Sequence, residues 1–344
     1  MKRMSDEQAL EQFKKGDLVE LGRLADQMRR ELHPERQVTF VVDRNINYTN
    51  ICTSECRFCA FYRREGQADA YVLPQQVLKE KLQETIAAGG TQVMLQGGLH
   101  PGLNFNYYLD LLTYIKTNFP IAIHSFSPAE VLHMAHQSGL GVKKVLQALK
   151  TAGLDSLPGG GAEILVDEVR QRVSPKKISA DQWLEVMETA HAVGLETTAT
   201  MVIGMGETAE HRVAHFRKIR DLQDKTGGFR AFITWSYQPG NTEMGGEKIS
   251  SWDYLRTLSL SRLYMDNIKH IQGSWVTQGQ QVGQLTLAFG ANDLGSIMLE
   301  ENVVRAAGTA YQMSIDHMVS LIRSAGKIPA QRDTEYRIIK SFDC

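Results

Sequence analysis

The sequence predicts an α/β fold, a (β/α)8 barrel of TIM type, and two observations lead to this prediction. Segments with strand composition alternate with segments of helical periodicity about eight times, at roughly even spacing, which is typical of a closed parallel barrel. Every glycine-rich or polar cluster also falls directly after an expected strand, where the loops of such a barrel carry the reactive groups. A doubly wound open sheet is the competing fold, but no break in the middle of the chain marks two halves.

Buried β-branched and aromatic runs identify the strands, and proline or glycine marks where several of the intervening helices begin or end. Pro74 suits a first helical turn, and the pair Gly89-Gly90 suits the end of the same helix. The expected strands are 38–42, 92–95, 121–126, 155–157, 197–203, 229–237, 275–277 and 292–294. The expected helices between them are 73–88, 107–118, two pieces within 128–152, 180–193, 209–225, 252–270 and 282–289.

Two flanking regions complete the expected organisation. Residues 5–32 show an amphipathic helical pattern that fits two short helices. We therefore expect an N-terminal helical cap over residues 1–36 and the barrel over residues 37–300. Residues 301–344 are expected to form a C-terminal helical extension packed on the barrel, with a helix at 315–324 and a charged, partly extended end.

The composition is that of a globular protein of the cytoplasm. The 344 residues carry 38 Lys and Arg against 39 Asp and Glu, so no basic excess points to nucleic acid. No run of about 18 apolar residues indicates a membrane span, and the charged N-terminus lacks the apolar core of a signal peptide. Four cysteines, three of them in one loop, do not form a disulfide framework and favour a reducing compartment.

The most informative stretch is the loop that holds Cys52, Cys56 and Cys59 in a C-x3-C-x2-C spacing. Thiolates favour zinc and iron–sulfur clusters, and three of them can hold one cluster while leaving a fourth iron without a protein ligand from this loop. A structural zinc site is the alternative, but it needs four ligands, and Cys344 would have to fold back to supply the fourth. Phe58 can pack over a cluster and exclude water.

Several segments together carry a family resemblance. They are residues 50–62, 95–101, 157–164 and 289–294, and, more narrowly, 125–128, 274–279 and 298–304. The cysteine loop resembles that of the radical S-adenosylmethionine (SAM) superfamily. The combined set resembles the futalosine branch of that superfamily, which serves menaquinone biosynthesis, and the likeness covers nearly the whole chain.

The resemblance implies a [4Fe–4S] cluster on the three cysteines and SAM on the open iron. One electron from a low-potential donor such as flavodoxin or ferredoxin then cleaves SAM to methionine and a 5′-deoxyadenosyl radical. The implied substrate is dehypoxanthine futalosine: the radical removes hydrogen from C4′ of the ribose, and the carbon radical closes a ring onto the benzoate. Two alternatives stay open, namely the sister reaction of the branch, in which the radical adds to an enolpyruvyl double bond, and a zinc-stabilised binding module without turnover.

Candidate contacts to SAM follow the strands. Gly97 and Gly98 allow the backbone to approach a bound amino group, although Leu99 replaces the glutamate that often follows this pair in the superfamily. Glu163 can accept hydrogen bonds from SAM, or be a surface carboxylate at a helix start. The other candidates are Ser125, which is equally a helix cap, Arg170 for the methionine carboxylate, Met205 against the adenine, and Tyr62.

Candidate substrate contacts end the later strands. Trp235, Tyr237 and Trp275 can sandwich the benzoate ring, although a tryptophan is as often part of the core. Thr277 and Asn292 can bind polar groups of the substrate, with Asn292 directed at the sugar hydroxyls. Asp293 is the candidate catalytic base that takes the proton when aromaticity is restored.

Overall fold

The strands form the inside of the molecule. The computed structural model describes residues 3–342. The strands are β1 (Gln37–Val41), β2 (Asp43–Ile46), β3 (Gln92–Leu95), β4 (Ala122–Ile123), β5 (Thr197–Ile203), β6 (Phe229–Ser236), β7 (His270–Gln272), β8 (Asp293–Ser296), β9 (Ile328–Arg332) and β10 (Ile338–Ser341). β1 and β2 are two halves of one extended run that is interrupted at Val42, and each half has its own neighbours.

The strands close into a barrel through parallel pairing. β2 pairs with β3, and β3 pairs with β4. The bridges His124–Ser156 and Leu157–Thr197 take the place of a fourth strand and connect β4 to β5. β5, β6, β7 and β8 then pair in order, and β8 pairs with β1, so the ring returns to the first strand. The predicted (β/α)8 barrel is confirmed.

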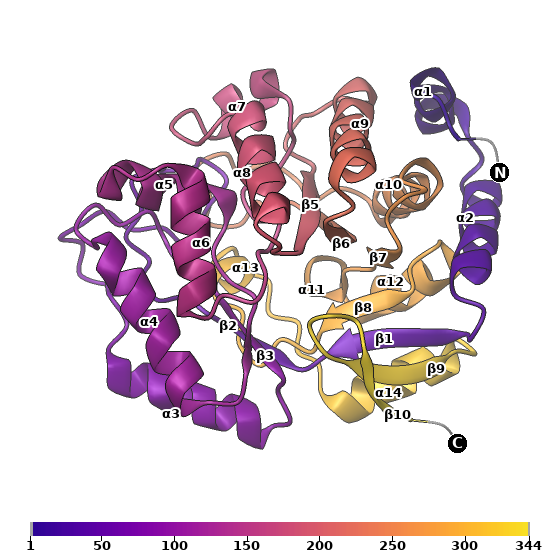
Figure 1. Cartoon of the computed structure of the whole chain (residues 1–344). Helices are drawn as coiled ribbons and strands as arrows, with labels where there is room; N and C mark the ends of the chain where they lie inside the picture. Colours follow the sequence, from indigo (N-terminus) through magenta and orange to yellow (C-terminus); the bar gives the residue numbers. More distant parts are fainter. Residues whose placement is uncertain (1–2, 343–344) are drawn as a thin grey trace.

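The helices surround this barrel, most of them in an outer ring, with α11 and α13 inside that ring (Figure 1). They are α1 (Asp6–Lys15), α2 (Leu18–Leu32), α3 (Gln75–Ala87), α4 (Phe105–Asn118), α5 (Pro128–Ser138), α6 (Val142–Ala152), α7 (Asp167–Val173), α8 (Ala180–Ala192), α9 (Ala209–Thr226), α10 (Ser251–Tyr264), α11 (Trp275–Gln278), α12 (Gln280–Leu285), the 3-10 turn η1 (Thr286–Ala288), α13 (Val303–Ala306) and α14 (Ile315–Ser324). Most of the expected helices are present, and the structure adds α7, which the sequence does not predict.

The segment around Trp275 is where the prediction of secondary structure is wrong. The expected strand at 275–277 is the short helix α11, and the seventh strand lies earlier, at β7. The expected helix 252–270 ends at Tyr264 and leaves room for that strand. The Ser274 side chain accepts a hydrogen bond from the Thr277 amide at 3.4 Å, which is the capping interaction that starts a helix. The β-branched and aromatic composition of α11 reflects burial rather than strand geometry.

The N-terminal helices lie on the outside of the ring beside α9 and α10 (Figure 1). Phe13 stacks on Phe216 with ring centroids 6.2 Å apart. Arg256 on α10 donates hydrogen bonds to the carbonyl groups of Gln12 and Gly16, at the end of α1. The cap is therefore anchored by both apolar and polar contacts.

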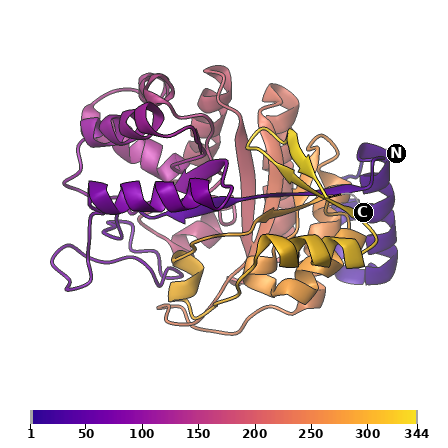
Figure 2. The ribbon, with the colours of Figure 1, turned by 90° about the horizontal axis from the view of Figure 1, so that it is seen from below.

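The C-terminal residues extend the sheet. β9 pairs in parallel with β1, and β10 returns antiparallel to β9. α14 packs against β9 and α12. Both ends of the chain lie on the same side of the molecule (Figures 1 and 2). Cys344 lies outside the described residues.

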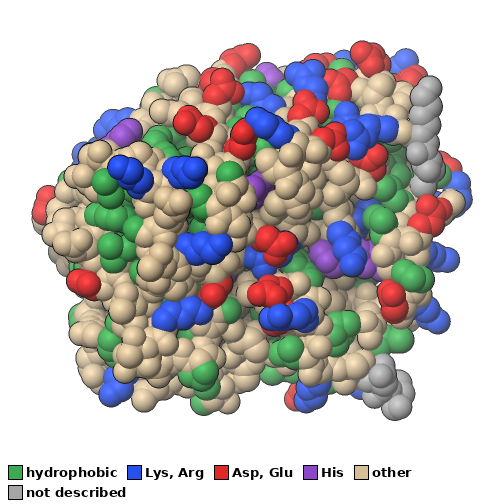
Figure 3. Space-filling view, in the orientation of Figure 1, with side chains coloured by type: hydrophobic (Ala, Val, Ile, Leu, Met, Phe, Trp, Pro, Cys, Tyr) green, Lys and Arg blue, Asp and Glu red, His purple; other side chains and the backbone are tan. Residues whose placement is uncertain are grey.

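The surface carries both signs of charge. Lys and Arg side chains are interspersed with Asp and Glu side chains on the face shown in Figure 3, in keeping with a formal net charge of −1. Within residues 3–342, no helix combines the length and the apolar composition that a bilayer crossing requires.

Candidate active site

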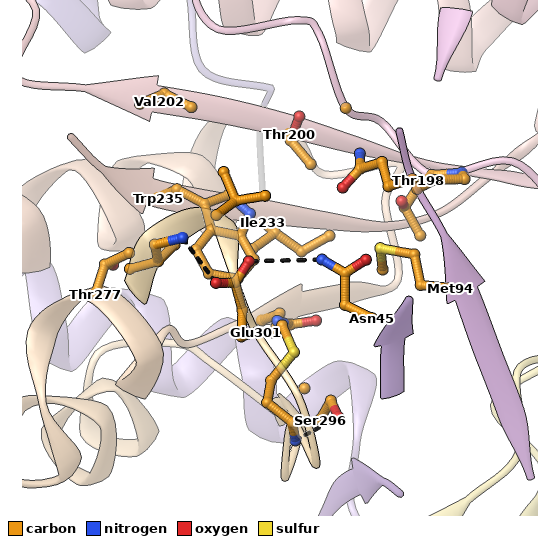
Figure 4. Close-up of a pocket in the computed structure, with 18 of the residues that line it drawn as sticks. Asn45, Met94, Thr198, Thr200, Val202, Ile233, Trp235, Thr277, Ser296 and Glu301 are labelled. Atoms are coloured by element: carbon orange, nitrogen blue, oxygen red, sulfur yellow. Dashed lines mark hydrogen bonds between the residues drawn. The ribbon is translucent and has the colours of Figure 1, made fainter. Parts of the chain in front are cut away.

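A cavity of about 310 Å³ lies inside the barrel and reaches the cysteine loop. Phe58 and Cys59 of that loop form part of its wall. The strands and the loops and short helices that follow them contribute the rest. Figure 4 shows the strand residues Asn45, Met94, Thr198, Thr200, Val202, Ile233, Trp235 and Ser296 around the space. The cysteine loop and the ends of the strands therefore face one shared cavity, as the barrel fold predicts.

The cysteine loop follows β2 and is held by backbone hydrogen bonds. The Cys52 amide donates to the carbonyl of Arg63 at 3.0 Å, and the Cys59 amide donates to the carbonyl of Cys56 at 3.0 Å. The Arg63 guanidinium donates to the carbonyls of Ala60 and Tyr62 at 3.1 and 2.8 Å. These contacts fix the turn that presents the thiols.

The three thiols are free and lie near one another. Burial raises the pKa of Cys56 to about 12, and the neighbouring thiols of Cys59 and Cys52 add to the rise. Within residues 3–342, no group of three or more His, Cys, Asp and Glu side chains is arranged as a site for a metal ion. A cubane cluster spreads its thiolates over separate iron atoms, and this requirement fits a C-x3-C-x2-C loop.

The two glycines after β3 serve the cysteine loop. A Cβ atom on Gly98 would lie 2.1 Å from the carbonyl oxygen of Ile51 and 2.8 Å from Cβ of Cys52. A Cβ atom on Gly97 would lie 2.4 Å from the ring of Tyr48. Neither glycine lines the cavity. Their expected contact with a bound amino group stays a prediction, whereas close packing under the loop is what the structure shows.

Replacing Gly98 by Ala is expected to displace the cysteine loop, because a backbone carbonyl stands where the methyl group would be. We expect the variant to take up much less iron on anaerobic reconstitution. Gly141→Ala is the matched control, since a Cβ there meets nothing within 4 Å. Iron per chain and thermal stability measure the effect, and a Gly98→Ala protein with full iron content would contradict it.

Glu163 is the predicted SAM contact that lies in the cavity wall. Its Oε1 accepts a hydrogen bond from the Lys177 ammonium at 2.8 Å, whereas its Oε2 is buried without a hydrogen-bond partner. Its φ of 41° is in the left-handed region, which is uncommon for a residue with a side chain. The orphaned oxygen at the cavity is a feature that a bound hydrogen-bond donor would satisfy.

Lys177 is a residue of this site that the sequence analysis missed. Its ammonium lies 5.5 Å from the centroid of the Phe58 ring, in the cysteine loop. Burial lowers its pKa, but the charges of Glu163 and Cys56 outweigh that effect and the net pKa is raised. Lys177 therefore stays cationic between the cysteine loop and Glu163. The sequence does not predict this position, because a single lysine in a charged segment carries no distinguishing pattern. The loop before α8 places Lys177 there.

Arg170 does not lie in the cavity wall, and its side chain binds backbone carbonyl groups instead. Its buried guanidinium donates to the carbonyls of Ala162 and Ile178 at 2.5 and 2.6 Å and lies 3.7 Å from Glu163. It thus fixes the glycine-rich loop that carries Glu163. A direct contact between Arg170 and the SAM carboxylate has no support in this arrangement.

The remaining candidate SAM contacts also lie outside the cavity wall. The Ser125 hydroxyl accepts a hydrogen bond from the Leu95 amide at 2.8 Å and links neighbouring strands. Met205 is buried, and its amide donates to Glu207 at 2.8 Å. Tyr62 is partly exposed next to Arg63. Their roles toward SAM remain predictions.

The structure separates the candidate substrate residues into two groups. Trp235, Tyr237 and Thr277 line the cavity. Trp275 is buried in the core and donates its ring N–H to the carbonyl of Ser296 at 2.9 Å. Asn292 accepts a hydrogen bond from the buried Arg262 at 2.7 Å, away from the cavity wall.

Asp293 does not lie in the cavity wall. It begins β8, where Arg332 of β9 donates to its carboxylate at 2.6 and 3.2 Å. The Thr39 hydroxyl and the Gly295 amide occupy the same two oxygens at 2.6 and 2.7 Å. This geometry does not support Asp293 as the base, because both oxygens of its carboxylate are engaged by these donors.

Several known proteins are similar to this chain in sequence and in fold. The radical SAM superfamily matches residues 46–219, and the CofH/MqnC C-terminal region matches residues 226–343. Cyclic dehypoxanthine futalosine synthase of Halalkalibacterium halodurans is 50% identical over 99% of this chain and 93% of its own length. The protein of that name from Streptomyces coelicolor is 45% identical over 99% of this chain and 87% of its own length.

The fold has solved counterparts as well. Methylornithine synthase superposes with a TM-score of 0.76 at 19% identity, covering 95% of this chain and 94% of its own. At that identity the likeness supports the barrel fold alone. The matched regions and the full-length identity show that this chain belongs to the radical SAM superfamily, in the group that carries the CofH/MqnC C-terminal region.

Proposed function

We propose that this protein converts dehypoxanthine futalosine to cyclic dehypoxanthine futalosine in menaquinone biosynthesis. The reaction removes hydrogen from C4′ of the ribose and joins that carbon to the benzoate ring. The observation that carries the proposal is 50% identity over nearly the full chain to an enzyme of that name. The shared cavity supports it, because Cys59 of the cysteine loop and Trp235 of β6 line the same space.

The residues present fit the cofactors that the family uses. Cys52, Cys56 and Cys59 would hold a [4Fe–4S] cluster, and the loop that carries them is already fixed by its own hydrogen bonds. When bound, the cluster and SAM supply a 5′-deoxyadenosyl radical. The orphaned Oε2 of Glu163 would accept a hydrogen bond from SAM, and the Lys177 cation beside it would balance a carboxylate.

The cavity walls suit a substrate with an aromatic ring and a sugar. Met94, Val202, Ile233 and Trp235 give apolar surface against which a benzoate ring would pack (Figure 4). Asn45 has a buried Oδ1 without a hydrogen-bond partner, so it would accept a hydrogen bond from a sugar hydroxyl. These residues would position the substrate and exclude water, while the cofactors supply the difficult chemistry.

The electron would come from flavodoxin or ferredoxin in the cytoplasm. Cationic side chains on and beside the cysteine loop favour docking of an acidic donor there. Arg57, Arg64 and Lys176 are 44%, 67% and 58% exposed, although each also pairs with a glutamate. A cytoplasmic location fits free thiols reserved for a cluster.

The competing function is that of aminofutalosine synthase, in which the radical adds to an enolpyruvyl double bond. An anaerobic assay with SAM, a strong reductant and each substrate in turn separates the two. Cyclisation releases 5′-deoxyadenosine beside a product with the mass of cyclic dehypoxanthine futalosine, whereas addition incorporates the adenosyl group into the product. We expect the first pattern, and adenosyl incorporation with the enolpyruvyl substrate alone would refute the proposal.

A further inference from the structure

The carboxyl group of Glu301 belongs neither to the cysteine loop nor to the candidate SAM contacts. This residue follows β8, on the loop before α13, and its side chain lines the cavity. Figure 4 shows it pointing into the middle of the space, toward Asn45 and below Ile233 and Trp235. The carboxyl therefore lies among the apolar side chains where an aromatic ring would pack.

The two oxygens of Glu301 are held unequally. Oε2 accepts a hydrogen bond from the Val304 amide at 2.7 Å. Oε1 has only a long contact of 3.5 Å from the Asn45 side chain. Burial raises the pKa of Glu301 to about 7, and the hydrogen bonds from Val304, Arg305 and Asn45 limit the rise. The side chain is thus fixed at one oxygen, and its other oxygen has room for a proton near neutral pH.

The other carboxyl groups in the cavity wall are already engaged. Asp43 accepts hydrogen bonds from the Ser296 hydroxyl and, at 2.6 Å, from the side chain of Gln92, so both of its oxygens are occupied. Glu163 pairs with the Lys177 ammonium at 2.8 Å, which compensates its charge beside the cysteine loop. Oε2 of Glu163 also lacks a hydrogen-bond partner, but the Lys177 ammonium beside this carboxylate sets it apart from Glu301, which lies among apolar side chains.

Nearby basic groups also have other partners. The ring of His124, which lines the cavity, shares a hydrogen bond of 2.6 Å with the Ser156 hydroxyl, and burial holds its pKa well below the usual value. Arg332 is paired with Asp293 at 2.6 Å. Among the described residues of the cavity wall, Glu301 is the best-placed proton acceptor.

We propose that Glu301 accepts the proton that leaves the benzoate ring after ring closure, which restores aromaticity. This inference rests on the proposed function. The bond between C4′ and the ring carbon forms first and leaves an unpaired electron in the ring. The C–H bond at that carbon then breaks, its electron pair stays in the ring, and the proton passes to Oε1 of Glu301. One electron leaves to a one-electron oxidant of the iron–sulfur class.

The timing of this step gives a specific test. Because the proton leaves after hydrogen abstraction, Glu301→Gln should still form 5′-deoxyadenosine while the cyclised product falls. General-base removal typically costs about 100-fold or more, so we expect the ratio of product to 5′-deoxyadenosine to fall about 100-fold. The assay uses the cluster-loaded protein with SAM, dithionite and dehypoxanthine futalosine, and both compounds are measured by mass spectrometry.

Glu300→Gln is the matched control. It removes the neighbouring carboxylate, which instead pairs with Lys81 at 2.6 Å and does not line the cavity. We expect this variant to keep the wild-type ratio. Glu301→Asp, which retains a carboxyl group at a shorter reach, should give an intermediate ratio and serves if Glu301→Gln fails to load its cluster.

The outcomes separate the two proposals. A wild-type protein that makes no cyclised product refutes the proposed function itself. A wild-type protein that cyclises, beside a Glu301→Gln protein with an unchanged ratio, overturns the assignment of Glu301. A parallel fall of both compounds also leaves the ratio unchanged and would make Glu301 a structural residue. If only Glu301→Asp can be loaded, a wild-type ratio in that variant overturns the assignment.

Discussion

Replacing Cys52, Cys56 or Cys59 singly by Ala abolishes cluster binding and SAM cleavage. Each thiolate would hold one corner of the cluster, and the C-x3-C-x2-C loop contains no further cysteine that could replace it. The Cys56 thiol is buried and the other two are partly buried, so an incomplete cluster would be exposed to water on the side of the missing ligand. Iron and sulfide content, visible absorbance and 5′-deoxyadenosine formation after anaerobic reconstitution measure the loss.

Cys344→Ala serves as the control for the cysteine variants. That residue lies at the far end of the chain, outside the described residues, and the sequence gives it no place in the C-x3-C-x2-C loop. We expect this variant to retain its iron and its activity. A Cys56→Ala protein with a full complement of cluster iron, or a Cys344→Ala protein without it, would contradict the assignment of the three ligands.

Replacing Asp293 by Asn lowers the free energy of unfolding by about 3 to 5 kcal/mol, as expected when one partner of a buried ion pair is lost. The side chains of Asp293 and Arg332 are 0% and 6% exposed and lie 2.6 Å apart. The substitution leaves the Arg332 guanidinium buried without a counter-charge and removes the ion pair that connects β9 to β8 across β1. Chemical denaturation of the folded protein measures the change.

The same variant separates a structural role of Asp293 from a catalytic one. We expect its folded fraction to keep the wild-type ratio of cyclised product to 5′-deoxyadenosine, since the carboxylate lies outside the cavity wall. Glu20→Gln is the control for the loss of charge alone: its partner Arg23 is 61% exposed, and such surface pairs contribute about 0 to 1 kcal/mol. Wild-type stability together with a reduced ratio would restore Asp293 as the base.

The sequence predicts the barrel well because its signals are local. The C-x3-C-x2-C spacing predicts the cluster loop directly, and the alternation of buried strands and amphipathic helices predicts the order of most elements. The failure at α11 has a physical cause: Trp275 and Val276 are buried whichever secondary structure they adopt, so their composition does not distinguish a strand from a short capped helix. The structure adopts the helix, with Ser274 as its N-cap.

The site is harder to predict because tertiary contacts assemble it. Lys177 and Glu163 are fourteen residues apart in the sequence and meet through the loop that Arg170 holds. Glu301 falls beside the expected domain boundary at residue 300, yet it faces the middle of the cavity. Asp293 shows the reverse, because it was expected in the site and instead pairs with Arg332 of β9. No local sequence pattern predicts that β9 pairs with β1.

By the proposed function, the cysteine loop and the cavity together remove hydrogen from C4′ of dehypoxanthine futalosine and close a ring. The most direct test uses substrate that carries deuterium at C4′, incubated anaerobically with SAM, dithionite and the reconstituted protein. Mass spectrometry of the 5′-deoxyadenosine then shows whether the label has moved. We predict one deuterium in 5′-deoxyadenosine for each cyclised product, and cyclised product beside unlabelled 5′-deoxyadenosine would contradict the claim.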